Sequence, residues 1–455
     1  MGHQGLSGRN RIRCFLAGLF CVLLASTAVA QEEVATTTSS RVTQDLGFKI
    51  GRLRLHPGFS LQNVYDSNVT NASSRYDPQS PTDPQIVQDY VMHLVGALRL
   101  EFPDDAISIS LDGSAGYVRY FGLDNGSTTD LSALTGRVEL AINLFKDAIV
   151  SFQLLDSFTR SVQPQQVGLV FTNDRIYNLA SGRLGFKPGG GQLRFFTGYS
   201  FEFERYDDPD QANLNWRQHN VFLQWELEFL PKTAFFMASS LGFRSYYDFD
   251  PARDEFATNA EAPDAMPFAV SAGVAGRISS KVLINISVGY GNSFSENYED
   301  YSSVVAKAEI TGQFTPRAFL KGGFERAYAV IPTYSYTAEN KIYLEYQQYL
   351  LRETLRLYLY GAFSYIQFGP ADQGVDTDLR PNEVARIGDR HDMLWTLTPS
   401  LQYYILAWFN IEGGYTLTWR DTDYFIRRVN LDGEQSFTYY DYLKHEVFLK
   451  LTLSY

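Results

Sequence analysis

The chain has 455 residues, of which 39 are basic and 51 are acidic, and its formal net charge is −12. Proteins that bind nucleic acid through its phosphates need positive charge, so this balance argues against nucleic acid as a partner. The two cysteines, Cys14 and Cys21, lie within the first thirty residues. If that segment is removed, the remaining chain can form neither a disulfide framework nor a cysteine metal site, and we expect no cofactor.

Residues 1–30 have the parts of a secretory signal peptide. The basic stretch at 9–13 precedes an apolar run, and residues 28–30 (Ala-Val-Ala) form a small-residue cleavage site. The run is about a dozen residues long, whereas a spanning helix needs roughly twenty. Removal of this segment with its three arginines would leave 36 basic and 51 acidic residues, a net charge of −15.

Residues 31–51 (QEEVATTTSSRVTQDLGFKIG) are polar, short and rich in Thr and Ser. We interpret them as a periplasmic linker rather than a plug or a docking domain. Receptor-type transporters need a plug, and secretion or insertion barrels usually carry periplasmic domains. The composition of this segment therefore argues against a receptor-type transporter and against a secretion or insertion barrel.

From residue 52 to the end, apolar and polar side chains alternate along many segments. In the stretch 192–204 the odd positions are mostly apolar and the even positions mostly polar, which predicts strands with one apolar and one polar face. Aromatic residues make up 15% of the chain, and no apolar stretch after residue 30 approaches a spanning helix. The other structure that satisfies its backbone in lipid is a closed β-barrel.

We count eighteen alternating segments. They begin near residues 52, 90, 105, 131, 148, 174, 192, 216, 233, 265, 281, 300, 317, 337, 353, 390, 408 and 441. The number falls to sixteen if a weak segment, such as 131–145 or 337–350, is misread. Short turns alternate with generally longer polar loops, and the longest loops are 66–89, 249–263, 369–388 and 421–439.

Short periplasmic turns and long extracellular loops are typical of outer-membrane barrels. The predicted fold is therefore all-β: a transmembrane, antiparallel, up-and-down β-barrel of residues 52–455, in contact with outer-membrane lipid and lipopolysaccharide. Eighteen strands give a backbone diameter of roughly 35 Å, which side chains alone cannot fill. We expect a water-filled channel unless a loop folds inward.

Candidate lumen-lining residues are charged side chains on the polar faces of the predicted strands. The acidic ones are Glu202, Glu204, Glu226 and Glu228, and the basic ones that could balance them are Arg194, Lys341 and Arg356. An unbalanced acidic patch would disfavour small anions. The alternative, which we favour, is the ordinary solvated face of a wide barrel.

No catalytic or metal-binding set is recognisable, and we do not expect an enzyme. His445-Glu446 begins like the zinc motif H-E-x-x-H, but Leu449 stands where the second histidine is required. The acidic stretches 207–215 and 248–255 lack the ligand spacing of a calcium loop.

The stretch RLRLHPGFSLQNVYDSNVTN (52–71) resembles the opening of the bacterial β-barrel porin 2 family. The resemblance rests on an L-x-P-x-x-S-L strand and a Y-D-x-N turn, carried here by Leu55, Pro57, Ser60, Leu61, Tyr65, Asp66 and Asn68. It implies a barrel that serves as the outer-membrane exit for exopolysaccharide or capsule polymers. It also implies a periplasmic polysaccharide export protein as a partner on the short-turn side.

The leading hypothesis is thus an outer-membrane channel for polysaccharide export. The first alternative is a general or substrate-selective diffusion porin for small solutes, which would be preferred if a long loop such as 66–89 or 369–388 folds inward. The second alternative is a structural or adhesive barrel whose lumen is blocked by its loops.

The last residues, HEVFLKLTLSY (445–455), predict a final strand that closes against the first strand near Arg52. Its odd positions would face lipid, and Tyr455 would lie at the periplasmic interface, where an amphipathic ring is favoured. Together with Leu451 and Leu453, this terminal aromatic residue resembles the signal read by the outer-membrane barrel assembly machinery.

Overall fold

The computed structural model describes residues 47–75, 85–123, 128–162, 174–248, 264–296, 299–331, 334–369, 384–387, 390–429 and 435–455. The predicted signal peptide and the first part of the predicted linker, residues 31–46, lie outside the described residues. So does the predicted loop 249–263.

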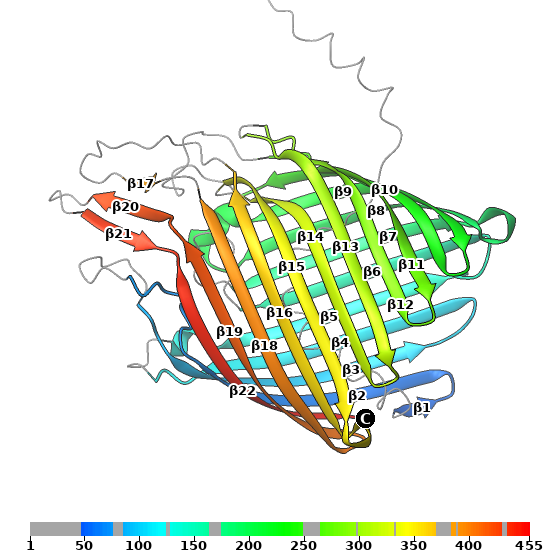
Figure 1. The fold of residues 1–455 in the computed structure, drawn as a ribbon, viewed down its shortest axis with the longest axis horizontal. Helices are drawn as coiled ribbons and strands as arrows, with labels where there is room; N and C mark the ends of the chain where they lie inside the picture. The colour runs from blue at the N-terminus through cyan, green and yellow to red at the C-terminus, as the bar shows by residue number, and fades with distance from the viewer. Residues whose placement is uncertain are drawn as a thin grey trace, which may run out of the picture.

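Eighteen antiparallel strands form one closed barrel (Figure 1). They are β2 (Leu53–Asp66), β3 (Asp89–Phe102), β4 (Ile107–Tyr120), β5 (Ala133–Leu144), β6 (Val150–Ser161), β7 (Arg175–Phe186), β8 (Leu193–Tyr206), β9 (Trp216–Leu230), β10 (Thr233–Tyr246), β11 (Phe268–Ser279), β12 (Val282–Asn292), β13 (Ser302–Thr315), β14 (Ala318–Ile331), β15 (Tyr334–Leu350), β16 (Leu355–Phe368), β18 (His391–Leu406), β19 (Phe409–Thr422) and β22 (Tyr442–Ser454). Each strand pairs with the next, and β22 pairs with β2 to close the ring.

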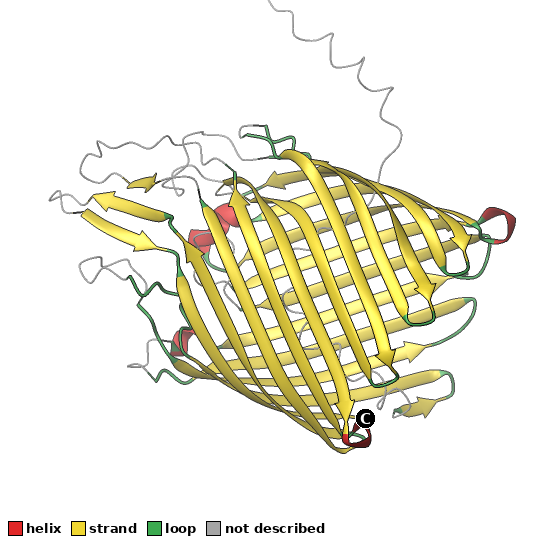
Figure 2. Ribbon diagram, in the orientation of Figure 1, coloured by secondary structure: helices red, strands yellow, loops and turns green. Residues whose placement is uncertain are grey.

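The predicted strand count is confirmed. Every predicted start lies within three residues of the observed one, and the two weak segments form β5 and β15. Short turns join the strands at one end of the barrel, and longer connections join them at the other (Figure 2). In the described part of the chain, no helix has the length and apolar character needed to cross a membrane.

The two faces of the wall differ in polarity. On β9, Val221 and Phe229 point outward and are 50% and 51% exposed, whereas Gln218 on the inner face is buried. Large apolar side chains are exposed on the outer face of strand after strand around the barrel. A closed ring of paired strands with an apolar outer face satisfies its backbone within lipid. The protein is an outer-membrane β-barrel.

A small second sheet extends beyond one side of the barrel mouth (Figure 1). It consists of β17 (Val384–Ile387), β20 (Phe425–Val429) and β21 (Gln435–Tyr439), which are antiparallel. Residues 369–388 and 421–439 therefore contain strands as well as loops. At the base of this sheet the buried Arg390 forms an ion pair with Asp392 (3.0 Å) and lies over the ring of Tyr440.

The seam between the first and last strands has two parts. From Gly58 to Asp66, β2 pairs with β22. Residues 53–55, nearer the periplasm, pair instead with a short strand β1 (Phe48–Ile50), which continues the line of β22 in the same direction. Residues 48–50, the end of the predicted linker, thus pair with the periplasmic part of β2, beyond the point where its pairing with β22 ends.

Two contacts hold the chain terminus in this seam. The backbone N–H of Tyr455 donates to the carbonyl of Pro57 (3.0 Å), and the Tyr455 ring lies 4.8 Å from that of Phe48. The expected closure against the first strand is confirmed, but it begins at Gly58, because β1 occupies the place beside residues 53–55.

The turns beside the seam are also connected. Arg52, in the turn after β1, forms an ion pair with Asp104 in the turn between β3 and β4. The backbone N–H of Ala106 donates to the Asp104 carboxylate (3.0 Å) and lowers the pKa of that carboxyl below its usual range.

Candidate channel lumen

Three of the predicted lumen residues meet on β8 and β9, near the periplasmic ends of these strands. Arg194 on β8 lies 3.1 Å from the Glu226 carboxylate and 3.6 Å from the Glu228 carboxylate, both on β9. The register places Arg194 opposite Glu226. Because inner-face residues repeat every second position, one arginine can contact two acids of the neighbouring strand.

The acids Glu202 and Glu204 lie higher on β8 and are both buried. Glu204 pairs with Arg175 of β7 (3.2 Å) and accepts a hydrogen bond from the indole N–H of Trp216 (2.9 Å). Glu202 accepts hydrogen bonds from the Tyr177 hydroxyl (3.2 Å) and the Asn220 amide (2.8 Å). Strands β7, β8 and β9 therefore supply a partner for each carboxylate.

The remaining two candidates, Lys341 and Arg356, lie on β15 and β16. Arg356 is only 2% exposed, and its guanidinium lies 3.8 Å from the Glu412 carboxylate of β19. Lys341 lies opposite Glu325 of β14 in the strand register. These two basic residues are thus far along the wall from the acids of β8 and β9, which have other partners.

Charge pairing continues around the inner face. Further pairs are Arg99 with Glu101 (2.6 Å), Arg137 with Glu139 (2.9 Å), Lys321 with Glu309 (3.1 Å) and Lys444 with Asp66 (2.7 Å). Opposite charges a few ångströms apart largely cancel at the distance of a passing solute. The acids therefore do not form an unbalanced negative patch.

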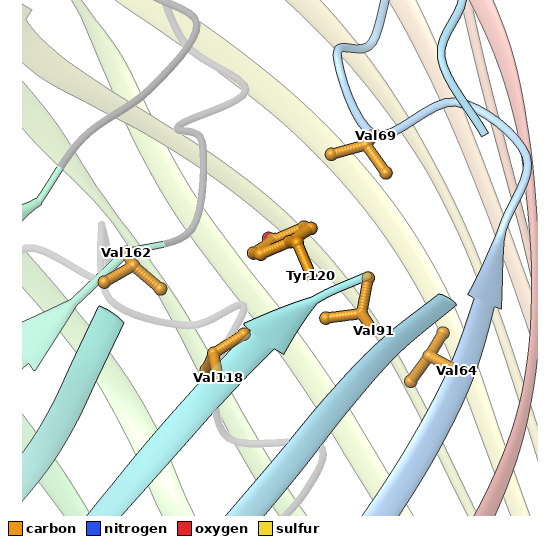
Figure 3. Packing of buried hydrophobic residues seen from close by; sticks show 6 residues of the cluster. All are labelled: Val64, Val69, Val91, Val118, Tyr120 and Val162. Atoms are coloured by element: carbon orange, nitrogen blue, oxygen red, sulfur yellow. The ribbon is translucent and has the colours of Figure 1, made fainter. Parts of the chain in front are cut away.

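The loop that follows β2 folds over the inner side of the extracellular mouth. Val69 of this loop is buried in an apolar cluster with inward side chains of β2, β3 and β4, and with the residue that follows β6 (Figure 3). The members are Val64, Val69, Val91, Val118, Tyr120 and Val162. Nearer the periplasm, these strands present mostly polar residues to the lumen. The cluster therefore marks the level at which the inner face of the wall packs against the loop instead of facing water.

Polar contacts extend this anchoring along the loop. Asn68 is buried, its side chain donates to the carbonyl of Ala72 (2.8 Å), and it accepts from the Ala72 backbone N–H (2.9 Å). Ser73 donates to Asp441 (2.9 Å), and Arg75 pairs with the same carboxylate (3.1 Å). The segment 67–75 is thus fixed to both β2 and the start of β22.

A second element extends beyond its neighbouring strand on the other side of the barrel. Pairing between β13 and β14 ends at Arg326, whereas β14 and β15 remain paired up to Ile331 and Tyr334. We call the extension beyond this point, residues 327–331 and 334–337, the β14–β15 arm.

The arm leans toward β10. The guanidinium of Arg244, on β10, donates to the carbonyl oxygen of Val330 at 2.7 Å. Along the wall, β10 and β14 are separated by four inter-strand steps, which amount to roughly 19 Å. An arginine side chain cannot span that distance, so the β14 edge of the arm leans toward β10 over the extracellular ends of the strands between them, while Thr337 on the other edge stays paired with Phe368 of β16.

Stacked tyrosines hold the arm in place. The Tyr328 ring stacks on Tyr301 at 4.3 Å, and its hydroxyl can donate to the carbonyl of Phe268 (2.8 Å) or of Asn292 (2.9 Å). Tyr336 contacts the Tyr301 ring edge-on at 5.2 Å. Tyr328 therefore covers the extracellular ends of the shorter strands β11 and β12.

Arg244 connects the arm to the buried acids. Its guanidinium lies 3.9 Å from the centre of the Trp216 ring and donates to Gln218 (2.7 Å), while Trp216 donates to Glu204. Sequence reasoning missed Arg244, Trp216 and Tyr328. Their alternation marked them as strand residues. Arg244 and Trp216 meet across the β9–β10 pair, and only the lean of the arm brings the Val330 carbonyl to Arg244.

The sequence matches no family model, and no curated protein matches it. Its structure is similar to outer-membrane barrels. The outer membrane protein opdK from Pseudomonas aeruginosa aligns with a TM-score of 0.44 and 8% identity, over 88% of this chain and 99% of that one. A BenF-like porin from Pseudomonas fluorescens Pf-5 aligns with a TM-score of 0.44 and 10% identity, over 88% and 99%. The siderophore receptor PirA from Pseudomonas aeruginosa gives 0.42 and 9%, over 88% and 80%.

Membership of the β-barrel porin 2 family stays a prediction carried by residues 52–71. Within the described ranges, no group of three or more His, Cys, Asp or Glu side chains is arranged to hold a metal ion.

Proposed function

We propose that the protein is a substrate-selective diffusion channel for small polar solutes, with little preference between anions and cations. The observation that carries this proposal is the packing of the loop 67–75 against the inner side of the mouth, and the lean of the β14–β15 arm toward β10 supports it. An inward element in a wide barrel limits the size of the solute that can pass.

The paired charges support weak ionic selectivity. Glu202, Glu204, Glu226 and Glu228 each face a nearby basic or hydrogen-bonding side chain. A lumen of this kind offers many hydrogen-bond donors and acceptors but little net field. Uncharged or zwitterionic polar solutes fit it better than a strongly charged one.

Reconstitution in planar bilayers and in liposomes tests the proposal. We expect single-channel conductance, a reversal potential close to zero in a potassium chloride gradient, and faster liposome swelling with small neutral sugars than with larger ones. A folded sample without conductance would contradict the proposal and would favour a barrel blocked by its loops. A strong preference for anions or for cations would contradict the proposed weak ionic selectivity.

Polysaccharide export is the second candidate, and the resemblance of residues 52–71 favours it. In that case a periplasmic polysaccharide export protein would dock on the short-turn side. A deletion strain should then carry less cell-surface polysaccharide. Unchanged polymer on the surface of that strain would remove this candidate while leaving the diffusion channel standing.

We also propose that Tyr455, with Leu451 and Leu453, is the signal recognised by the assembly machinery. Deletion of Tyr455 should reduce the amount of folded barrel in the outer membrane and leave single-channel conductance unchanged. The variant Phe48→Ala is a matched control, because it removes the ring contact in the folded barrel without altering the terminal strand. Equal losses in both variants would indicate that the contact, and not the signal, matters.

A further inference from the structure

A charged side chain lies on the lipid-facing side of β6. Asp156 belongs to the outward series of this strand with Leu154, which is 41% exposed, and its neighbours across the sheet are Leu140 and Ala180. It follows Val150, the first residue of β6, by six positions. At an ordinary strand tilt this places it roughly 15 Å above the periplasmic end, within an apolar band about 25 Å tall.

Other outward charges on the neighbouring strands lie much nearer the extracellular side. Arg119, Arg160 and Arg205 are each the second-last residue of β4, β6 and β8. At that level, water and lipid headgroups can solvate a guanidinium. Asp156 has no such access, because it lies about midway along its strand.

The hydrogen bonding of Asp156 within its own chain is weak. Its carboxylate accepts from the side-chain amide of Asn178, on β7, at 3.5 Å, which is the outer limit for such a bond. The same amide nitrogen also lies 3.3 Å from the carbonyl of Ser157. In hydrocarbon no water completes the set, so an ionisable group here points to a contact with something other than lipid.

The outward residues beside Asp156 on β7 are small. Ala180 and Gly182 follow Asn178 on the same outward series of β7. A Cβ atom at Gly182 would lie 3.7 Å from Leu154 and 3.8 Å from Phe152, which are ordinary contact distances. The packing of this barrel therefore does not require glycine at position 182, and the missing side chain leaves room for another surface.

We propose that Asp156, Asn178, Ala180 and Gly182 form the contact between two copies of this chain in the membrane. A donor and an acceptor side by side on adjacent strands are self-complementary about a two-fold axis. Asn178 of each copy then donates to Asp156 of the other. The small residues allow the two walls to approach closely enough for these bonds to form. This contact is independent of the proposed transport function.

Cysteine cross-linking in isolated outer membranes tests the contact. Because both native cysteines lie in the predicted signal peptide, Ala180→Cys introduces a single thiol into the mature chain. We expect oxidation to give a disulfide-linked dimer. The matched control Val221→Cys places a thiol at an exposed outward position of β9 and should give none.

Substitutions at Gly182 and Asp156 test the contact by a second route. Gly182→Leu places a large side chain in the proposed contact and should lower the dimer fraction in mild detergent, measured by light scattering. A heat-modifiable gel band shows that the barrel of this variant is folded. Asp156→Leu should weaken dimerisation on the order of tenfold. A monomeric wild type, a Gly182→Leu variant as dimeric as the wild type, or a cross-link to a different protein would each overturn the proposal.

Discussion

The loop 67–75 and the β14–β15 arm, the two elements at the mouth, are anchored by different kinds of contact. The loop 67–75 is fixed by an apolar cluster and by buried hydrogen bonds within its own turn. The β14–β15 arm is paired on one side with β16, through Thr337 and Phe368. Its other edge, beyond the end of β13, is held by the Arg244–Val330 bond, by the Tyr328 hydroxyl and by contacts of Tyr328 and Tyr336 with the ring of Tyr301.

This difference predicts different consequences of mutation. An apolar cluster is stabilised by the burial of many atoms, so its loss affects the folding of the strands that share it. The side-chain contacts that hold the β14 edge of the arm each contribute modestly, so their loss should loosen this edge while the pairing with β16 remains. We therefore regard the loop as part of the barrel core and the β14 edge of the arm as the more easily displaced of the two elements.

The largest effect is expected from Tyr120→Ala. Removal of this buried ring opens a cavity between β4 and the loop and should lower the free energy of unfolding by about 3 kcal/mol. Denaturant unfolding in lipid vesicles measures this change. The control is Tyr117→Ala on the same strand, whose ring faces outward and is exposed, and the distinction between loop and arm fails if both variants lose the same stability.

A smaller effect on stability, but a larger one on conductance, is expected from Arg244→Ala. The variant loses the bond to the Val330 carbonyl and the contact with Trp216, worth about 1 kcal/mol each. The β14 edge of the arm should then loosen, raising conductance and admitting larger sugars. Arg183→Ala is the matched control, because this inward arginine stacks on Phe196 below the arm. Conductance equal to that of the wild type would show that the arm does not limit passage.

The smallest effect is expected from the double variant Glu202→Gln, Glu204→Gln. Removing these carboxylates leaves the positive charges of Arg175 and Arg244 less balanced, so the permeability ratio should shift toward anions by on the order of twofold. Reversal potentials in a salt gradient measure the shift. Glu353→Gln, in an exposed periplasmic turn where it pairs with Arg317, serves as the control and should leave the ratio unchanged. A shift toward cations would contradict this account of the lumen.

The sequence predicted the wall of the barrel well because the signal is local. Each strand exposes alternate residues to lipid and to the lumen, so the pattern of a short segment is enough to indicate it. The same parity placed Arg194, Glu202 and Arg356 on the inner face. It could not indicate that Arg194 pairs with Glu226 while Arg356 pairs with Glu412.

Strand alternation and loop sorting, which the sequence carries by itself, determined an eighteen-stranded outer-membrane barrel and its polar interior. Only the tertiary structure decided how the loop 67–75 and the β14–β15 arm are held at the mouth, because Val69, Arg244 and Tyr328 contact strands other than their own. The pairing of β1 with residues 53–55 of β2 is likewise decided by the tertiary structure. Closing the ring brings the two ends of the chain together, and no local pattern records which residues will then be neighbours.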